Sequence, residues 1–126
     1  MFKTFRSIRF GGQRDKSLAK STNVPYTEQA MNVEKTETYI NWFEGLRDLR
    51  VQNQIIVRIG RLERGLLGDI RPVGEGISEL RIHHGPGYRI YLRQSGDSFV
   101  LLLCGGNKDD QARDIKRAKQ LAQEIE

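Results

Sequence analysis

The spacing of the hydrophobic residues changes twice along the chain, and this change constrains the fold more than any other feature. Between residues 39 and 62 they recur every three or four positions, which is typical of helices with one buried face. Between residues 77 and 103 they alternate with polar residues or form one short apolar run, as in strands. From residue 109 the helical spacing returns. This order predicts an α+β domain with helices before and after a sheet.

The first half of the chain predicts two helices. Thr36 or Thr38 can cap the first helix, and Glu37 lies close to its positive end. The second helix ends at Gly65 and Gly68. Their buried faces are Tyr39, Trp42, Phe43 and Leu46, and then Val51, Ile55, Ile59 and Leu62. We expect a helical hairpin, preceded by a short edge strand at residues 32–35.

The second half predicts three or four strands and a last helix. The candidate strands are residues 70–73, 77–83, 88–93 and 99–103, separated by the turns Gly85-Pro86-Gly87 and Ser95-Gly96-Asp97. Pro72 confines the first strand to an edge or a bulge. Gly105-Gly106 are expected to end the last strand. The final helix, from about residue 109, buries Ile115, Ala118, Leu121, Ala122 and Ile125.

The predicted fold is therefore α+β: an N-terminal helical hairpin, a curved three- to four-stranded antiparallel sheet and a C-terminal helix. We expect the helices on one face of this sheet and an exposed, concave opposite face. The length of 126 residues suits one domain. The single cysteine, Cys104, cannot form a disulfide within the chain and is expected in the core. The longest apolar run, residues 99–104, is far too short for a membrane span, so a soluble, cytoplasmic protein is expected.

Most of the excess positive charge lies near the N-terminus. The net charge is +5, and residues 1–30 contribute +4, with six basic residues against two acidic ones. These residues lack hydrophobic periodicity and contain a glycine pair and a Ser/Thr/Asn cluster. They are interpreted as a basic, flexible extension of a domain at residues 31–126. Either the extension is functional, or it is an extra segment ahead of a natural start at Met31.

The alternation of the strands predicts a cluster of basic side chains. If Leu80, Ile82, Ile90 and Leu92 point to the core, then the outward residues are Glu79, Arg81, His83, Arg89, Tyr91 and Arg93. Lys108 follows the next strand and can join them. Arginines placed side by side repel one another, so such a cluster indicates a partner anion, and phosphate matches the planar guanidinium. The alternative is an ordinary solvated face, on which Glu79 pairs with Arg81 or Arg93.

Other kinds of site receive little support from the sequence. No group of cysteines or acidic residues has the spacing of metal ligands, so neither a metal nor another cofactor is expected. Gly74-Glu75-Gly76 precedes a strand, whereas phosphate-binding glycine loops precede helices.

Several joined motifs resemble one toxin family. They include Gly68-Asp69, residues 73–76, residues 79–82, residues 85–91 (Gly-Pro-Gly-Tyr-Arg-Ile-Tyr) and residues 102–108 (Leu-Leu-Cys-Gly-Gly-Asn-Lys). They resemble the phage-related addiction-module killer proteins, which are HigB-like members of the RelE/ParE toxin superfamily. The resemblance extends over residues 31–126.

The resemblance implies the toxin of a type II toxin–antitoxin pair. Such toxins are metal-independent endoribonucleases that cut mRNA on the ribosome and so inhibit translation. The 2′-hydroxyl of the RNA attacks the adjacent phosphate and leaves a cyclic phosphate. The expected partners are mRNA on the ribosome and an antitoxin of the helix-turn-helix type.

Carried over residue by residue, the resemblance implies a set of site residues. Arg89 matches a phosphate-binding arginine, and Arg81 and Lys108 match basic residues that stabilise negative charge. Tyr91 or His83 is the candidate for proton transfer. Arg93, His84 and Arg71 are candidates for RNA contact. Some relatives carry a catalytic tyrosine in the last helix, where this chain has Asp114.

Two other functions stay open. ParE-type relatives share the fold but inhibit DNA gyrase by binding it, and they do not need a basic sheet face. The chain could also be a non-catalytic module that binds an antitoxin.

Overall fold

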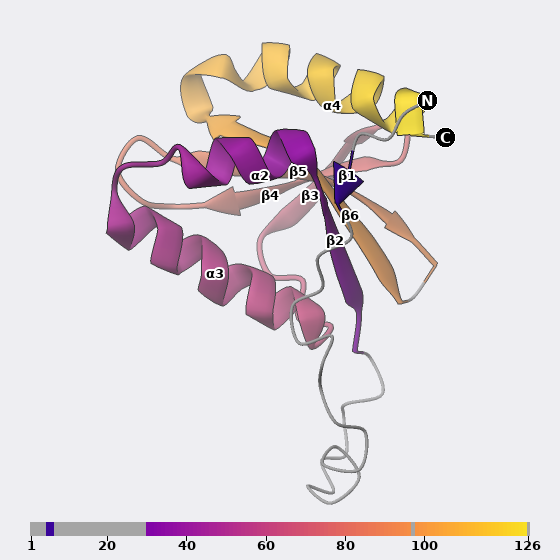
Figure 1. The fold of residues 1–126 in the computed structure, drawn as a ribbon, viewed down its shortest axis with the longest axis horizontal. Helices are drawn as coiled ribbons and strands as arrows, with labels where there is room; N and C mark the ends of the chain where they lie inside the picture. Colours follow the sequence, from indigo (N-terminus) through magenta and orange to yellow (C-terminus); the bar gives the residue numbers. More distant parts are fainter. Residues whose placement is uncertain (1–4, 7–29, 97, 126) are drawn as a thin grey trace, which may run out of the picture.

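The computed structural model describes residues 5–6, 30–96 and 98–125, which form an α+β domain (Figure 1). A sheet with the strand order β1-β2-β6-β5-β4-β3 lies between helices. The strands are β1 (Phe5–Arg6), β2 (Asn32–Thr36), β3 (Ile70–Gly74), β4 (Ile77–Ile82), β5 (Tyr88–Ser95) and β6 (Phe99–Asn107). The helices are α2 (Glu37–Glu44), α3 (Leu49–Glu63) and α4 (Gln111–Ile125), and a 3₁₀ turn, η2 (Lys108–Asp110), precedes α4.

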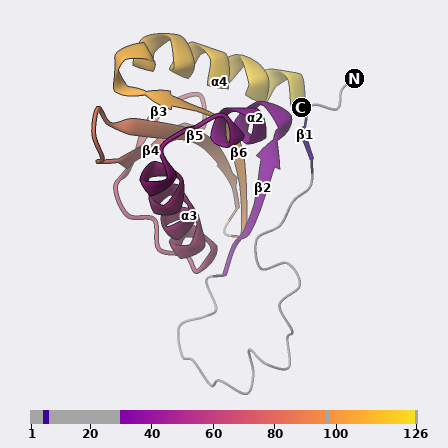
Figure 2. The ribbon, with the colours of Figure 1, turned by 60° about the vertical axis from the view of Figure 1, so that its left-hand side comes forward.

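Helices cover both faces of the sheet, so the expectation of one open, concave face is wrong. Alternate residues of the strands enter two separate cores because successive side chains point to opposite faces. Ile90, Leu92 and Leu102 pack with α2 and α3, whereas Tyr91, Leu101 and Leu103 pack with α4. Figure 2 shows α4 and α3 on opposite sides of the strands. The stripe predicted for the last helix does lie in the second core, with Ala118, Leu121 and Ala122 buried.

Among the described residues the sheet has six strands and is mixed, which corrects the expectation of three or four antiparallel strands. β2 runs parallel to β6, with Val33 opposite Val100 and Lys35 opposite Leu102. The other neighbours are antiparallel. The central position predicted for residues 99–103 is confirmed, since β6 lies between β2 and β5.

The predicted helical hairpin is also corrected. α2 lies mainly against β6, α3 contacts β2, and the two helices make few contacts with each other. The predicted stripe of α3 is buried, whereas Tyr39 is the one residue of the other predicted stripe that is buried, and Trp42, Phe43 and Leu46 are partly buried. Each helix therefore gains its stability from the sheet, because burial of its apolar face occurs there.

Thr36 joins the sheet to α2, and the predicted helix cap is confirmed. Its hydroxyl accepts a hydrogen bond from Tyr39 N at 3.0 Å and donates one to the carbonyl oxygen of Leu103 at 2.6 Å. The residue has no exposed surface. One side chain thus caps α2 and ties its first turn to β6.

The glycine pair does not end β6, which continues to Asn107. A Cβ atom on Gly105 would collide with the ring of Trp42 on α2, and one on Gly106 would collide with the carboxylate of Asp114 on α4. These glycines lie inside the strand because a helix approaches closely on each face.

Pro72 lies where the sequence predicts, in edge strand β3, and the register between β3 and β4 shifts between Pro72 and Gly74.

Of the predicted N-terminal extension, Phe5 and Arg6 form β1 and pair with β2. Its other residues up to residue 29, and Asp97 of the predicted turn, lie outside the described residues. In the part of the chain that the structure describes, no helix has the length and apolar character to cross a membrane.

Candidate functional site

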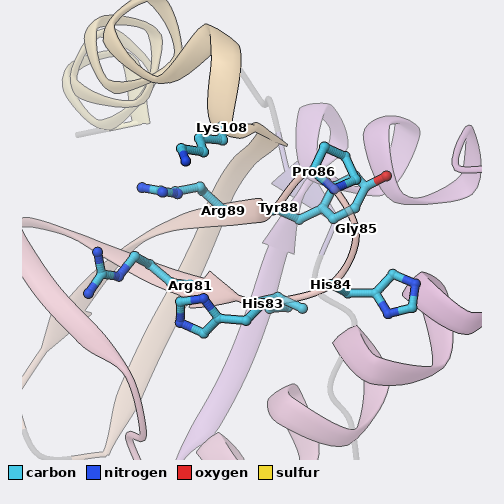
Figure 3. Close-up of a pocket in the computed structure, with 10 residues that line it drawn as sticks. Arg81, His83, His84, Gly85, Pro86, Tyr88, Arg89 and Lys108 are labelled. Carbon is cyan, nitrogen blue, oxygen red and sulfur yellow. The ribbon is translucent and has the colours of Figure 1, made fainter.

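Basic residues from β4, β5 and η2 meet around an open pocket of about 530 Å³ (Figure 3). The pocket is lined by Arg81, Ile82, His83, His84, Gly85, Pro86, Gly87, Tyr88, Arg89 and Lys108. Figure 3 shows the side chains of Arg81, Arg89 and Lys108 extending toward the same side of the view. Five of the predicted site residues are thus brought together, and no carboxylate lines the pocket.

The turn between β4 and β5 forms one wall and positions Lys108. Gly85 and Gly87 have φ angles of 56° and 91°, a backbone conformation that favours glycine. Gly87 N donates to the carbonyl oxygen of His84 at 2.9 Å, and Lys108 N donates to the carbonyl oxygen of Gly87 at 3.1 Å. The main chain of the turn therefore holds Lys108 beside Arg89, although the two residues are far apart in sequence.

Arg89 is anchored from inside the protein by Glu79. Its Nη1 lies 3.3 Å from Glu79 Oε1, and Glu79 has no exposed surface. Glu79 Oε2 accepts hydrogen bonds from Gln111 Nε2 at 2.7 Å and from the hydroxyl of Tyr91 at 3.3 Å. The alternative expectation, in which a solvated Glu79 pairs with Arg81 or Arg93, is therefore wrong, because Glu79 is buried and pairs with Arg89. Burial under α4 turns this carboxylate into a support for Arg89.

Asp69 connects Arg81 and His83, a role that the sequence did not predict. Asp69 Oδ2 lies 2.6 Å from His83 Nε2, and its Oδ1 lies 3.3 Å from Arg81 Nη2. The hydrogen bond from His83, helped by Arg81, holds the pKa of Asp69 below its ordinary value. Asp69 is therefore ionised at neutral pH. One sequence signal could have indicated this role: Asp69 directly precedes β3, and β3 pairs with β4, the strand that carries Arg81.

His84 points to α3 and differs from His83 in its contacts. Its Nδ1 lies 3.0 Å from the amide nitrogen of Gln54, and its Nε2 lies 3.7 Å from Asp48 Oδ2. Figure 3 shows its ring directed away from Arg81 and toward a neighbouring helix. His84 therefore connects the pocket turn to α3.

Three of the predicted site residues do not line the pocket. Tyr91 is fully buried under α4, and its pKa is raised by burial and by the nearby Glu79. Arg93 Nη1 donates to the carbonyl oxygen of Ala122 on α4 at 3.3 Å. Arg71 is exposed on edge strand β3, opposite Glu79 in the register. The first two were expected on an open face and are instead covered by α4.

Asp114, which the resemblance implies stands in the place of a catalytic tyrosine, is buried on α4. Burial raises the pKa of its carboxyl group above the ordinary value. Arg113 Nε lies 3.5 Å from its Oδ1.

The site offers three permanent cations and two imidazoles to an anion. Lys108 forms no ion pair with any residue that the structure describes, so its charge is fully available. Within the described ranges, no group of three or more His, Cys, Asp or Glu side chains could hold a metal ion. The arrangement can bind a phosphate group through charge-assisted hydrogen bonds and can place an imidazole beside it.

The chain has a close relative in Haemophilus influenzae, described only as an uncharacterized protein. The two are 47% identical over 95 residues, which make up 75% of this chain and 96% of the relative. No model of a known protein family matches the chain.

Among solved structures, the chain is similar to a chain of the toxin–antitoxin complex RelBE2 from Mycobacterium tuberculosis. The TM-score is 0.49 and the sequence identity is 23%, over 68% of this chain and the whole of the other. A likeness of this size does not assign a function.

Proposed function

We propose that this chain, which belongs to the same family as the Haemophilus influenzae protein, is the toxin of a type II toxin–antitoxin pair and cuts mRNA on the ribosome. The cut needs no metal ion and stops translation. The domain at residues 31–126 carries the activity, and residues 1–30 add positive charge for contact with ribosomal RNA.

The observation that carries the proposal is the pocket with Arg81, Arg89 and Lys108 around one opening. Arg81 and Arg89 are paired with Asp69 and Glu79, but neither carboxylate lines the pocket, and Lys108 forms no ion pair with a described residue, so the opening keeps positive charge that favours an anion. Two of the motifs by which the sequence resembles HigB-like toxins, residues 85–91 and 102–108, supply Arg89, Lys108 and the turn that lines the pocket before Arg89. The resemblance and the pocket therefore concern the same part of the molecule.

The chemistry follows from what a phosphodiester needs. The 2′-oxygen forms a bond to phosphorus while the bond from phosphorus to the 5′-oxygen breaks, which leaves a 2′,3′-cyclic phosphate and a 5′-hydroxyl. Arg81, Arg89 and Lys108 stabilise the negative charge that builds up on the phosphate oxygens. An imidazole takes the proton of the 2′-hydroxyl, and the departing 5′-oxygen gains one from a pocket cation or from water.

Tyr91 is not assigned to proton transfer in this proposal. Its hydroxyl lies under α4 and donates to Glu79, so its role is to support the ion pair between Glu79 and Arg89. His83 is 71% exposed and is the imidazole that a substrate can reach.

Exposed hydrophobic residues on the surface of α3 support the proposal of an antitoxin partner. Leu49, Ile56 and Val57 are exposed large hydrophobic residues on this helix, and Leu66 and Leu67, also exposed, lie in the loop that follows it. Apolar side chains gathered in this way commonly mark a protein interface. We propose that the antitoxin covers them and carries a helix-turn-helix domain.

The proposal is tested by inducing the chain in growing bacteria and mapping new mRNA 5′ ends. The wild type is expected to arrest growth and to produce cuts within translated frames. Lys108→Ala should remove the cuts, whereas Lys116→Ala, which loses one exposed cation on α4 outside the pocket, should retain them.

Other outcomes would replace the proposal. Growth arrest without mRNA cuts, together with loss of gyrase supercoiling activity in vitro, would assign the chain to the gyrase-binding toxins. An absence of arrest from a folded protein would leave a non-catalytic, antitoxin-binding module.

A further inference from the structure

Asp69, His83 and Arg81 form a connected group at the rim of the pocket, and this group goes beyond what the resemblance implies. The carboxylate of Asp69 contacts one side chain with each oxygen: His83 through Oδ2 at 2.6 Å and Arg81 through Oδ1 at 3.3 Å. Asp69 lies outside the pocket lining, so it reaches the pocket only through these two partners.

The position of Asp69 is fixed by its main chain. Its carbonyl oxygen accepts a hydrogen bond from Arg81 N at 3.0 Å, directly ahead of the pairing between β3 and β4. Arg58 on α3 reinforces the same place, since its Nη1 donates to the carbonyl oxygen of Arg81 at 2.7 Å. The carboxylate therefore projects from a rigid part of the sheet rather than from a free loop.

The contact with Asp69 determines which nitrogen of His83 carries a proton. An ionised carboxylate can only accept hydrogen bonds, so Nε2 of His83 must be the donor. In the neutral ring the lone pair is then on Nδ1. Nδ1 makes no hydrogen bond to any residue that the structure describes, and a substrate can therefore reach it.

His84 cannot take the same role. Its Nδ1 lies 3.0 Å from Gln54 Nε2, an amide nitrogen that donates, so the lone pair of this ring is already used. The two neighbouring histidines thus differ in their hydrogen bonds: the ring of His84 is tied to Gln54 on α3, and that of His83 is tied to Asp69.

We propose that Asp69 is a positioning residue that holds His83 with Nε2 protonated, so that His83 Nδ1 accepts the proton of the attacking 2′-hydroxyl. The proton moves from the 2′-oxygen to Nδ1, and the resulting imidazolium is stabilised by the carboxylate of Asp69. This assignment rests on the proposed function, and it makes His83 the base of the reaction rather than the acid.

The test uses purified full-length protein and ribosomes programmed with a short mRNA. His83→Gln is expected to lower the cleavage rate constant by about 100-fold or more, and Asp69→Asn by about 10- to 100-fold with little change in KM. Because Asp69 acts through His83, the double variant should be no slower than His83→Gln alone. An additional loss in the double variant would show that Asp69 acts elsewhere and would overturn the proposal.

A modified substrate distinguishes a base from an acid. Replacing the bridging 5′-oxygen by sulfur gives a leaving group that departs without a proton. Both single variants should remain as impaired on this substrate as on normal mRNA if His83 is the base. Recovery of the rate on the sulfur substrate would assign His83 to the acid step and would overturn the proposal.

One readout does not depend on cleavage. NMR of histidine-labelled protein at low temperature should show a downfield, exchange-protected Nε2 proton that both Asp69→Ala and His83→Gln lose, whereas His84→Gln retains it. If this proton is absent from the wild type, the positioning by Asp69 is wrong whatever the chain cuts. If it is present but no mRNA is cut, then the proposed function fails and the catalytic assignment fails with it, while the geometry stands.

Discussion

Arg89 Nη1 lies 3.3 Å from Oε1 of Glu79, and the side chain of Glu79 is completely buried. The same arginine lines the basic pocket. A residue proposed to bind phosphate is therefore also the counter-ion of a carboxylate in the interior. Loss of activity on substitution of Arg89 can then arise either from the missing cation or from a weakened fold.

The first prediction separates these two effects. Arg89→Ala should lower the free energy of unfolding by about 3–5 kcal/mol, because it leaves the carboxylate of Glu79 buried without its cation. Arg89→Ala combined with Glu79→Gln should recover part of this loss. Urea denaturation followed by circular dichroism measures all the variants. Lys108→Ala is the matched control and should change stability by no more than about 0.5 kcal/mol, since Lys108 is exposed. Equal stability of Arg89→Ala and wild type would contradict the buried ion pair.

The second prediction concerns three glycines that differ in the space available for an added Cβ atom. Gly105→Ala and Gly106→Ala should each cost about 1–3 kcal/mol, because the added methyl group meets the ring of Trp42 or the carboxylate of Asp114. Gly60→Ala, within α3 and with open space around its Cβ position, should instead stabilise by about 0.5–1 kcal/mol. Urea denaturation midpoints should therefore move in opposite directions, and a shift of the same sign at all three positions would contradict the close approach of α2 and α4 to β6.

Local patterns in the sequence predicted the elements of this fold well. Four features follow from interactions within a few residues or from the local pattern of hydrophobic residues. They are the cap at Thr36, the buried stripe of α3, the irregular edge strand at Pro72 and the central place of β6. What the periodicity could not determine is which face each helix covers. Strand alternation defines two faces but does not say that both are buried, so α4 was placed on the wrong side.

The candidate site was also predicted only in part, because the sequence did not reveal that α4 covers one face of the sheet. Arg81, His83, Arg89 and Lys108 are together because they lie near the ends of neighbouring strands, where the register alone brings them close. Tyr91 and Arg93 share their strand face but lie further along it, under α4. The roles of Asp69 and Glu79 were missed because each depends on a partner at least 10 residues away along the chain.

The third prediction concerns metal ions. If Arg81, Arg89 and Lys108 supply the positive charge for phosphate cleavage, then cleavage should not require a divalent cation in the chemical step. Purified protein and a free RNA oligonucleotide should give the same slow cleavage rate in magnesium and in excess EDTA, with Lys108→Ala as the inactive control. The 3′ ends of the products should carry a cyclic phosphate. A rate that falls to the background in EDTA and recovers with added metal would contradict the proposed chemistry.

The fourth prediction concerns Cys104, which is buried in the core beneath α4, as the sequence predicted for a small apolar position. Burial raises the pKa of its thiol from 9.0 to about 12. At pH 8 alkylation by iodoacetamide should therefore be at least roughly a thousandfold slower in the native protein than in urea, since it requires unfolding.

The raised pKa of Cys104 also has a defined effect on stability. Between about pH 9 and pH 12 the folded protein keeps the thiol proton that the unfolded chain releases, so the free energy of unfolding falls as the pH rises. Tyr39 and Tyr91, whose pKa values are also raised, act in the same direction at higher pH. Comparison with Cys104→Ala isolates the thiol, because both tyrosines are retained. Stability measured by urea denaturation at pH 8 and pH 10 should fall more steeply in the wild type than in Cys104→Ala, and parallel pH dependences would show that the thiol is not buried as described.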